Sequence, residues 1–220
     1  DRIRWLEFRR VLFRSIYIRV FFLVLLIGDW VFIGFFLKNR AKYPRIVEHK
    51  GLNIIEVFIY NACCYLCVGL IPSPLLPATH SAMIFFQIWG SIVLLSGVSL
   101  TFHTLRLRNA IGIQKTPNGL IKTGPYQMTR HPIYLGIIFI SLGLGLLTLN
   151  VEGLLFFPVI VLINYGEAVN EERFDLIYRF REEYEDYRQK VPILGSRIIW
   201  MLIFGMYGTF IALNLNIWEK

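Results

Sequence analysis

Charged residues are scarce in this sequence of 220 residues. Only 17% of them are Asp, Glu, Lys or Arg, whereas 55% are hydrophobic and 15% aromatic, and the mean hydropathy is +0.54. A typical soluble domain carries about 25% charged residues, so this balance excludes an ordinary soluble protein. Internal repeats, low-complexity tracts and long linkers are also lacking. We therefore predict a single integral membrane domain over residues 1–220.

Cysteines are equally few. The three that occur, Cys63, Cys64 and Cys67, fall in one apolar run, and no histidine lies near them in that segment. A structural zinc site needs four suitably spaced ligands, so we interpret these cysteines as small packing residues and expect no metal. A small-residue cleavage site after the first apolar run is also missing, which argues against a cleavable signal peptide.

Long apolar runs, in contrast, are abundant. A run of about 20 apolar residues can cross a bilayer as a helix, and five or six such runs are present. They are Ile16–Leu37, Ile54–Ile71, Ala82–Leu105, Ile133–Leu149, Gly153–Val169 and Ile198–Trp218. We predict an all-α, polytopic transmembrane bundle of five to six spans. Its fourth and fifth spans form a tight hairpin, and its last span, with Asn214 and Asn216, is the weakest.

The formal net charge of +8 is unevenly distributed. Basic residues gather in segments 38–50, 106–132 and 170–197, whereas segments 72–80 and 150–152 carry none. The positive-inside rule places the three basic segments in the cytoplasm, and this distribution explains the charge without a nucleic-acid partner. The basic segment 1–15 does not fit that topology, and we assign it no function.

One polar stretch, TGPYQMTRHPIYLG at residues 123–136, lies at the start of the fourth run. Its Gly-Pro pair predicts a turn, and Pro132 suits the first position of a helix, where its missing N–H costs nothing. The unpaired amides of such a helix start, with the helix dipole, suit a carboxylate or phosphate. The side chains expected around this start are Tyr126, Arg130, His131 and Tyr134.

The same stretch has a structural interpretation. Arg130 and His131 could anchor the helix at the membrane interface, with the two tyrosines in an aromatic belt. Gly136, one turn further on, would let a ligand or a neighbouring helix approach closely.

A second polar stretch follows the fifth run at residues 170–192. Asn170 is a plausible N-cap, which places Glu171 and Glu172 in the first turn, where the dipole favours acids. Apolar residues then recur at three- and four-residue spacing, which predicts an amphipathic helix that ends at Pro192. Because the hairpin is tight, the acidic pair should lie close to His131.

In this order, the two stretches resemble the isoprenylcysteine carboxyl methyltransferase family of integral membrane enzymes. The matching residues are LIKTGPYQMTRHPIYLG (120–136), the acidic pair, and EEYEDYRQKVP (182–192). The resemblance implies S-adenosylmethionine bound at the cytoplasmic ends of the helices. It also implies a lipidated or lipid-like acceptor that enters from the bilayer.

The resemblance further implies a cofactor and catalytic region over residues 118–192. The cofactor contacts carried over are Asn118, Gly119, Leu120, Ile121, Tyr126, His131, Pro132, Ile133, Tyr134 and Glu172. The catalytic candidates are Arg130, His131 and Glu171. This agrees with the chemistry of the residues, since a helix start can hold the methionine carboxylate and an acid can bind the ammonium or ribose hydroxyls.

The chain departs from the family in two places. Phe180-Arg181 stands where the family usually has Phe-Gly, so we expect the helix to continue through this point. The family commonly has an arginine about one turn before the cofactor-binding glutamate, where this chain has Ala168. A carboxylate acceptor needs a cation, for which Arg106, Arg130 and Arg173 are candidates. An amine acceptor must instead lose a proton, to Glu167 or Glu171.

Two other classes remain open. Membrane sterol and steroid reductases end in a similar hairpin and use NADPH, although the acidic pair and its spacing fit the methyltransferases better. A non-enzymatic transporter or scaffold would place polar residues along a path through the bilayer, for which only Asp29, Glu56 and His103 qualify.

Overall fold

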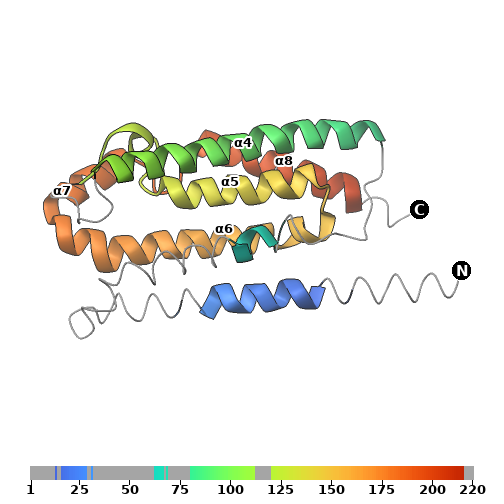
Figure 1. The fold of residues 1–220 in the computed structure, drawn as a ribbon, viewed down its shortest axis with the longest axis horizontal. Coiled ribbons are helices and arrows are strands. Elements are labelled where there is room, and N and C mark those ends of the chain that lie inside the picture. Colours follow the sequence, from blue (N-terminus) through green and yellow to red (C-terminus); the bar gives the residue numbers. More distant parts are fainter. Residues whose placement is uncertain are drawn as a thin grey trace, which may run out of the picture.

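The computed structural model of this chain describes residues 13, 16–28, 31, 62–66, 68, 80–111 and 120–215. Its main elements are α4 (His80–Ile111), η2 (Gly124–Gln127), α5 (Pro132–Leu147), α6 (Val151–Glu171), η3 (Glu172–Leu176), α7 (Ile177–Lys190) and α8 (Arg197–Leu215). An N-terminal helix, Ile16–Gly28, precedes them. These ranges contain no strand, and the predicted all-α bundle is confirmed (Figure 1).

Several helices can cross a membrane. Within the described ranges, three are long and apolar enough by length and composition: Ala82–Leu107, the continuous run Val151–Lys190, and Arg197–Asn214. The N-terminal helix and α5 are shorter but also apolar. The predicted second span lies mostly outside the described residues, as do Asp29, Glu56 and Cys67, but Cys63 and Cys64 are buried in the core.

The predicted hairpin of spans four and five is confirmed. Only three residues separate the end of α5 from the start of α6. Asn150 caps α6, since its Oδ1 accepts a hydrogen bond of 2.9 Å from the Gly153 amide. Leu149 takes a positive φ of 53° to make the reversal. The hairpin returns the chain to the end of the bundle from which α5 started (Figure 1).

α4 and α5 pack closely along a seam of glycines. A Cβ atom on Gly143 would lie 2.5 Å from the Leu94 backbone nitrogen, and one on Gly97 would lie 2.8 Å from the Gly136 carbonyl oxygen. Small residues allow helix backbones to approach in a membrane, where packing replaces the hydrophobic effect. Gly136 contacts Thr101 of α4, so a neighbouring helix does approach it closely.

The second polar stretch differs from the prediction at its start. Asn170 is not an N-cap, because α6 runs through it and continues without a break into η3, a π-helical turn, and then α7. The acidic pair therefore lies at the junction of α6 and η3 and not in the first turn of a new helix. The predicted end is confirmed, since α7 stops at Lys190, two residues before Pro192.

The expectation of continuous helix through Phe180-Arg181 is wrong. Arg181 has φ 47° and ψ −122°, which kinks α7. This is a conformation that L-residues avoid and glycine adopts readily. The backbone thus makes the turn that the family's Phe-Gly suggests, with an arginine in the glycine position.

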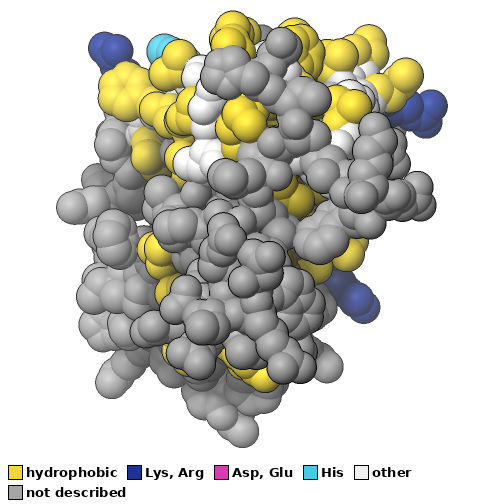
Figure 2. Space-filling view, turned by 90° about the vertical axis from the view of Figure 1, so that its right-hand side faces the viewer, with side chains coloured by type: hydrophobic (Ala, Val, Ile, Leu, Met, Phe, Trp, Pro, Cys, Tyr) yellow, Lys and Arg dark blue, Asp and Glu magenta, His cyan; other side chains and the backbone are white. Residues whose placement is uncertain are grey.

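The bundle has two distinct ends. The site end carries η2, η3 and α7, and the hairpin end carries residues 148–150 (Figure 1). At the hairpin end, the fully buried Arg19 donates a hydrogen bond of 3.0 Å from Nη2 to Asn150 Oδ1, and its Nε lies 3.7 Å from Glu152 Oε2. Figure 2 faces this end, where the described side chains at the surface are mainly hydrophobic.

Candidate active site

The first polar stretch folds into a tight turn that leads into α5. Gly124 has a positive φ of 61°, and η2 begins there with a proline in its first turn. α5 then begins at Pro132 with His131 as its N-cap residue. The predicted helix start is therefore confirmed, and the side chains of the two residues before it contact the junction of α6 and η3.

The Arg130 side chain donates four hydrogen bonds in this region. Its Nε and Nη2 donate to the two carboxylate oxygens of Glu172, at 2.7 and 3.2 Å. Its Nη1 donates to the carbonyl oxygens of Arg188 and Val191, at 2.7 and 2.9 Å. A planar guanidinium suits such a two-pronged contact with a carboxylate. One side chain thus fixes Glu172 and also holds the end of α7.

His131 lies between the two acids. Its Nε2 is 3.0 Å from Glu172 Oε1, and its Nδ1 is 3.4 Å from Glu171 Oε2. The ring is 5% exposed and lies 5.7 Å from the ring of Tyr134. With both ring nitrogens facing carboxylates, the doubly protonated imidazolium is the form that this geometry favours.

The titration of these groups reflects their pairing. Burial alone would lower the pKa of His131, but hydrogen bonds to Glu171 and Glu172 and the charges of both acids raise it above its ordinary value. Burial would raise the pKa of Glu172, but the hydrogen bond from His131 and the charges of His131 and Arg130 lower it. Folding therefore favours the charged form of both side chains.

The chain after α7 binds along the entry to α5. The Arg130 amide donates to the Pro192 carbonyl at 2.9 Å, and the His131 amide donates to the Ile193 carbonyl at 3.2 Å. The Thr129 hydroxyl also donates to the Ile193 carbonyl, at 2.8 Å. These contacts fix the relative positions of the two polar stretches, which lie far apart in the sequence.

The structure brings together most of the predicted site residues. Arg130, His131, Glu171 and Glu172 form one cluster, which we call the acidic-basic cluster. Pro132, Ile133 and Tyr134 form the first turn of α5 beside it. Tyr126 is linked through its carbonyl oxygen, which accepts a hydrogen bond of 2.5 Å from the Tyr187 hydroxyl. Leu120 and Ile121 are half-buried in the stretch before η2, and Asn118 and Gly119 lie outside the described residues.

Two tyrosines of α7 lie at the site but were not among the predicted site residues. Tyr184 is fully buried, and burial and then the charge of Glu172 raise the pKa of its hydroxyl. Tyr187 is 6% exposed and holds η2 as described above. Their three-residue spacing was visible as part of an apolar helix face, but nothing in that pattern indicates that the face covers the acids.

The donor set of the site fits an amino-acid zwitterion. The first amides of α5 and the nearby basic groups suit a carboxylate, and acids beside them suit an ammonium group. Of the two acids, Glu172 is engaged by Arg130 and His131, whereas the Glu171 side chain is 37% exposed and so accessible to a ligand. A cavity of about 320 Å³ lies between η2 and α7; it is lined by Lys122, Gln127, Asp186, Tyr187, Lys190 and Val191.

Known proteins match this part of the chain. The family model described as phospholipid methyltransferase matches residues 79–180. The protein-S-isoprenylcysteine O-methyltransferases of Saccharomyces cerevisiae and Xenopus laevis are each 36% identical, over 34% and 33% of this chain and 31% and 25% of their own lengths. Protein-S-isoprenylcysteine O-methyltransferase B of Arabidopsis thaliana is 29% identical over 46% of this chain and 48% of its own length.

The matched part thus covers less than half of each of these relatives. No solved structure matches the chain. The family match takes in α4, the hairpin and the whole acidic-basic cluster. Residues 79–180 of this chain are thus similar to the phospholipid methyltransferase family, and the predicted resemblance to the isoprenylcysteine methyltransferases is confirmed.

Proposed function

We propose that this chain is a membrane-embedded methyltransferase that uses S-adenosylmethionine and acts on a lipid-like or prenylated acceptor. The observation that carries the proposal is the acidic-basic cluster at the start of α5, which lies within the matched residues. The relatives support methyl transfer by their names, whereas nothing in the described residues favours the NADPH-dependent reductase. The site end faces the cytoplasm in this proposal, where a water-soluble cofactor reaches it.

The bound cofactor would supply a methyl group activated by its sulfonium. The amides of the first turn of α5 hold the cofactor's carboxylate, and the accessible Glu171 binds its ammonium group. Glu172 does not contact the cofactor in this proposal. It holds His131 and Arg130 in place from the buried side of the cluster. Methyl transfer needs an in-line approach, so this positioning is the chain's main contribution to the rate.

The acceptor's reactive group is set by the charges around the cluster. Ala168, where the family commonly has arginine, is fully buried, and Arg130 is engaged with Glu172 and two carbonyl oxygens. Glu167, 3% exposed, lies one helical turn before Glu171 on α6. We propose the carboxylate of a prenylated cysteine as the first acceptor to test, with Arg130 nearest to it, and an ethanolamine phospholipid as the alternative, with Glu167 as its proton acceptor.

Cofactor binding tests the proposal most directly. Detergent-purified wild type should bind S-adenosylmethionine and not NADPH in equilibrium dialysis. Substitutions His131→Ala and Glu172→Ala should each weaken binding about tenfold or more, because each removes a buried charged contact that positions the other cluster residues. Glu183→Ala supplies the control, since Glu183 pairs with Lys122 on an exposed part of α7 and should bind as wild type does.

Two results would contradict the proposal at different levels. Unchanged affinity in both cluster variants would remove the site assignment but leave the activity. Absence of binding by folded wild type would remove the activity itself. Transfer of a labelled methyl group to a prenylcysteine or to an ethanolamine phospholipid then decides the acceptor.

A further inference from the structure

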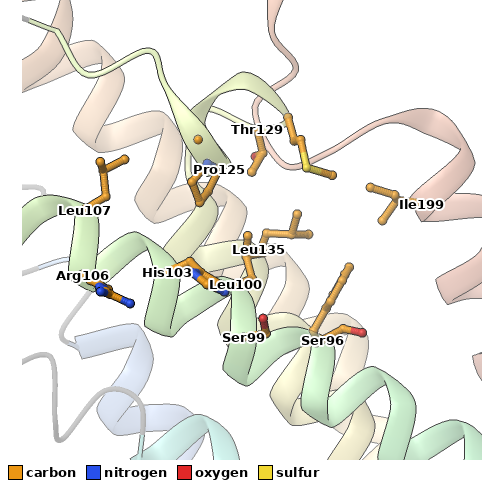
Figure 3. A pocket seen from close by; sticks show the side chains of 13 residues that line it. Ser96, Ser99, Leu100, His103, Arg106, Leu107, Pro125, Thr129, Leu135 and Ile199 are labelled. Carbon is orange, nitrogen blue, oxygen red and sulfur yellow. The ribbon is translucent and has the colours of Figure 1, made fainter.

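A second cavity adjoins η2 and includes none of the acidic-basic cluster residues in its lining. It is an open cleft of about 800 Å³ between α4, η2, α5 and the start of α8. Thr129 lines this cleft, whereas the next residue, Arg130, reaches Glu172. The cleft is therefore separate from the proposed methyl-transfer site, although both lie at the site end of the bundle. Figure 3 shows the side chains around it.

One face of α4 forms the polar wall of the cleft. Its lining residues Ser96, Ser99, Leu100, His103, Arg106 and Leu107 recur at three- and four-residue spacing, which places them on a single helix face. Arg106 and His103 lie toward the end of α4 that adjoins η2, and the two serines lie deeper along the helix (Figure 3). The basic groups thus occupy one end of the cleft.

The opposite wall is apolar. Leu135 of α5 and Ile199 of α8 line it (Figure 3), together with Phe139 of α5. The Arg106 end therefore suits an anionic group, since no acid is among the described residues that line the cleft. The remainder suits hydrocarbon.

The dimensions of the cleft match a lipid chain. Ser96 and Arg106 are ten residues apart on one helix, or roughly 15 Å at a rise of 1.5 Å per residue. That is about half of the ~30 Å hydrocarbon core, the depth of one leaflet. Arg106 would then lie at headgroup level, where basic pockets between membrane helices bind anionic lipid headgroups.

We propose that this cleft binds one anionic phospholipid. Its phosphate lies against Arg106 and His103, and one acyl chain runs along Leu100, Leu135 and Phe139 toward Ser96. The site does not depend on the proposed methyl transfer, since the lipid here is a bound partner and not the acceptor.

Photolabelling in nanodiscs tests this site. The probes are phosphatidylglycerol and phosphatidylcholine, each with a diazirine on one acyl chain and each diluted into phosphatidylcholine. The phosphatidylglycerol probe should label α4 between Ser96 and Arg106 and α5 between Leu135 and Phe139. It should do so about fivefold more than the phosphatidylcholine probe, since one basic side chain near a lipid phosphate accounts for a preference of this size.

Two variants separate charge from space. Arg106→Gln should reduce phosphatidylglycerol labelling to the phosphatidylcholine level, whereas Arg188→Gln, at an exposed arginine of α7 outside the cleft, should not. Ser99→Phe keeps the charge but fills the cleft from an exposed position, and should remove labelling of α5 by either probe. If Arg106→Gln does not fold, two comparisons still test the proposal. One is the labelling of wild type by the phosphatidylglycerol and phosphatidylcholine probes, and the other is the loss of α5 labelling in Ser99→Phe.

The proposal fails if both probes label these segments of wild type equally, or if labelling falls elsewhere on the chain. It fails equally if Ser99→Phe leaves labelling of α5 unchanged, or if the folded Arg106→Gln variant is labelled as Arg188→Gln is.

Discussion

At the scale of single residues, Glu172 is the point on which the site converges. Arg130, from before α5, and His131, the N-cap residue of α5, both bind its carboxylate. Arg130 simultaneously holds two carbonyl oxygens near the end of α7. Removing one partner of such a buried pair leaves the other charge uncompensated, which costs more than the pair contributes.

The cluster predicts a distinct pH dependence of stability. The pKa of His131 is raised above 6.5 on folding, so its contribution to stability is full below about pH 6.5 and is lost as the pH rises through the folded value. The pKa of Glu172 is lowered below 4.5, so its contribution is full above about pH 4.5 and is lost as the pH falls through the folded value. The cluster should stabilise most between these limits.

Thermal unfolding in detergent between pH 4 and 9 measures this effect. His131→Gln should lose the decline in unfolding temperature that wild type shows above pH 6.5. His103→Gln, at an exposed histidine of α4, should retain it. A decline that persists unchanged in His131→Gln would show that another group causes it.

Much of the site could be predicted from the sequence, for reasons that are local. Pro132 marks the helix start because its ring fixes φ, and the short hairpin brings the acids back to His131. That Glu172 is bound by Arg130 while Glu171 stays accessible could not be predicted, because the Arg130–Glu172 contact joins residues 42 positions apart. The covering role of Tyr184 depends on how α7 folds back, which residue spacing does not specify.

At the scale of elements, the helical run from α6 to α7 shows where local signals fail. Asn170 is a good capping residue, but it lies inside a helix that continues through the π-helical turn η3. Capping preference amounts to only about 1 kcal/mol, so the packing of a continuous helix overrides it. π-helical turns are frequent at functional sites, and this one begins at Glu172.

The kink in α7 predicts a stabilising substitution. Arg181→Gly should raise the free energy of unfolding by about 1 kcal/mol, because the positive φ strains any side-chain-bearing residue. Arg188→Gly in the same helix should lower it by up to about 1 kcal/mol, since glycine disfavours regular helix. Denaturant titration in mixed micelles compares the two, and a loss of stability in Arg181→Gly would contradict the strain.

The close packing of α4 and α5 predicts that enlarging a glycine between these helices lowers the free energy of unfolding. Gly143→Ala should destabilise by about 1–3 kcal/mol, because its Cβ would meet the backbone of α4 at Leu94. Gly205→Ala on α8 supplies the control, since no atom lies within 4 Å of its Cβ position and alanine favours helix. Equal stability of the two variants in the same titration would show that the helices are not closely packed there.

At the scale of the whole molecule, the acidic-basic cluster and the hairpin turn lie at opposite ends of the bundle. The exposed Lys122 lies next to η2, and the exposed Thr148 lies at the hairpin turn. In a cysteine-free background, Thr148→Cys should react with a membrane-impermeant maleimide on intact cells. Lys122→Cys should react only after the membrane is opened. The reverse pattern would place the site end outside and remove the proposed cytoplasmic access for the cofactor.

The buried Arg19 carries a consequence for biogenesis. An arginine within a membrane helix is costly unless it is paired, and this one contacts Asn150 and Glu152, which are synthesised about 130 residues later. Glu152, a counter-charge of Arg19, is therefore not yet made when the N-terminal helix enters the bilayer. The surroundings of the first described helix are thus completed only when the hairpin is synthesised, so the final packing of Arg19 forms late in membrane insertion.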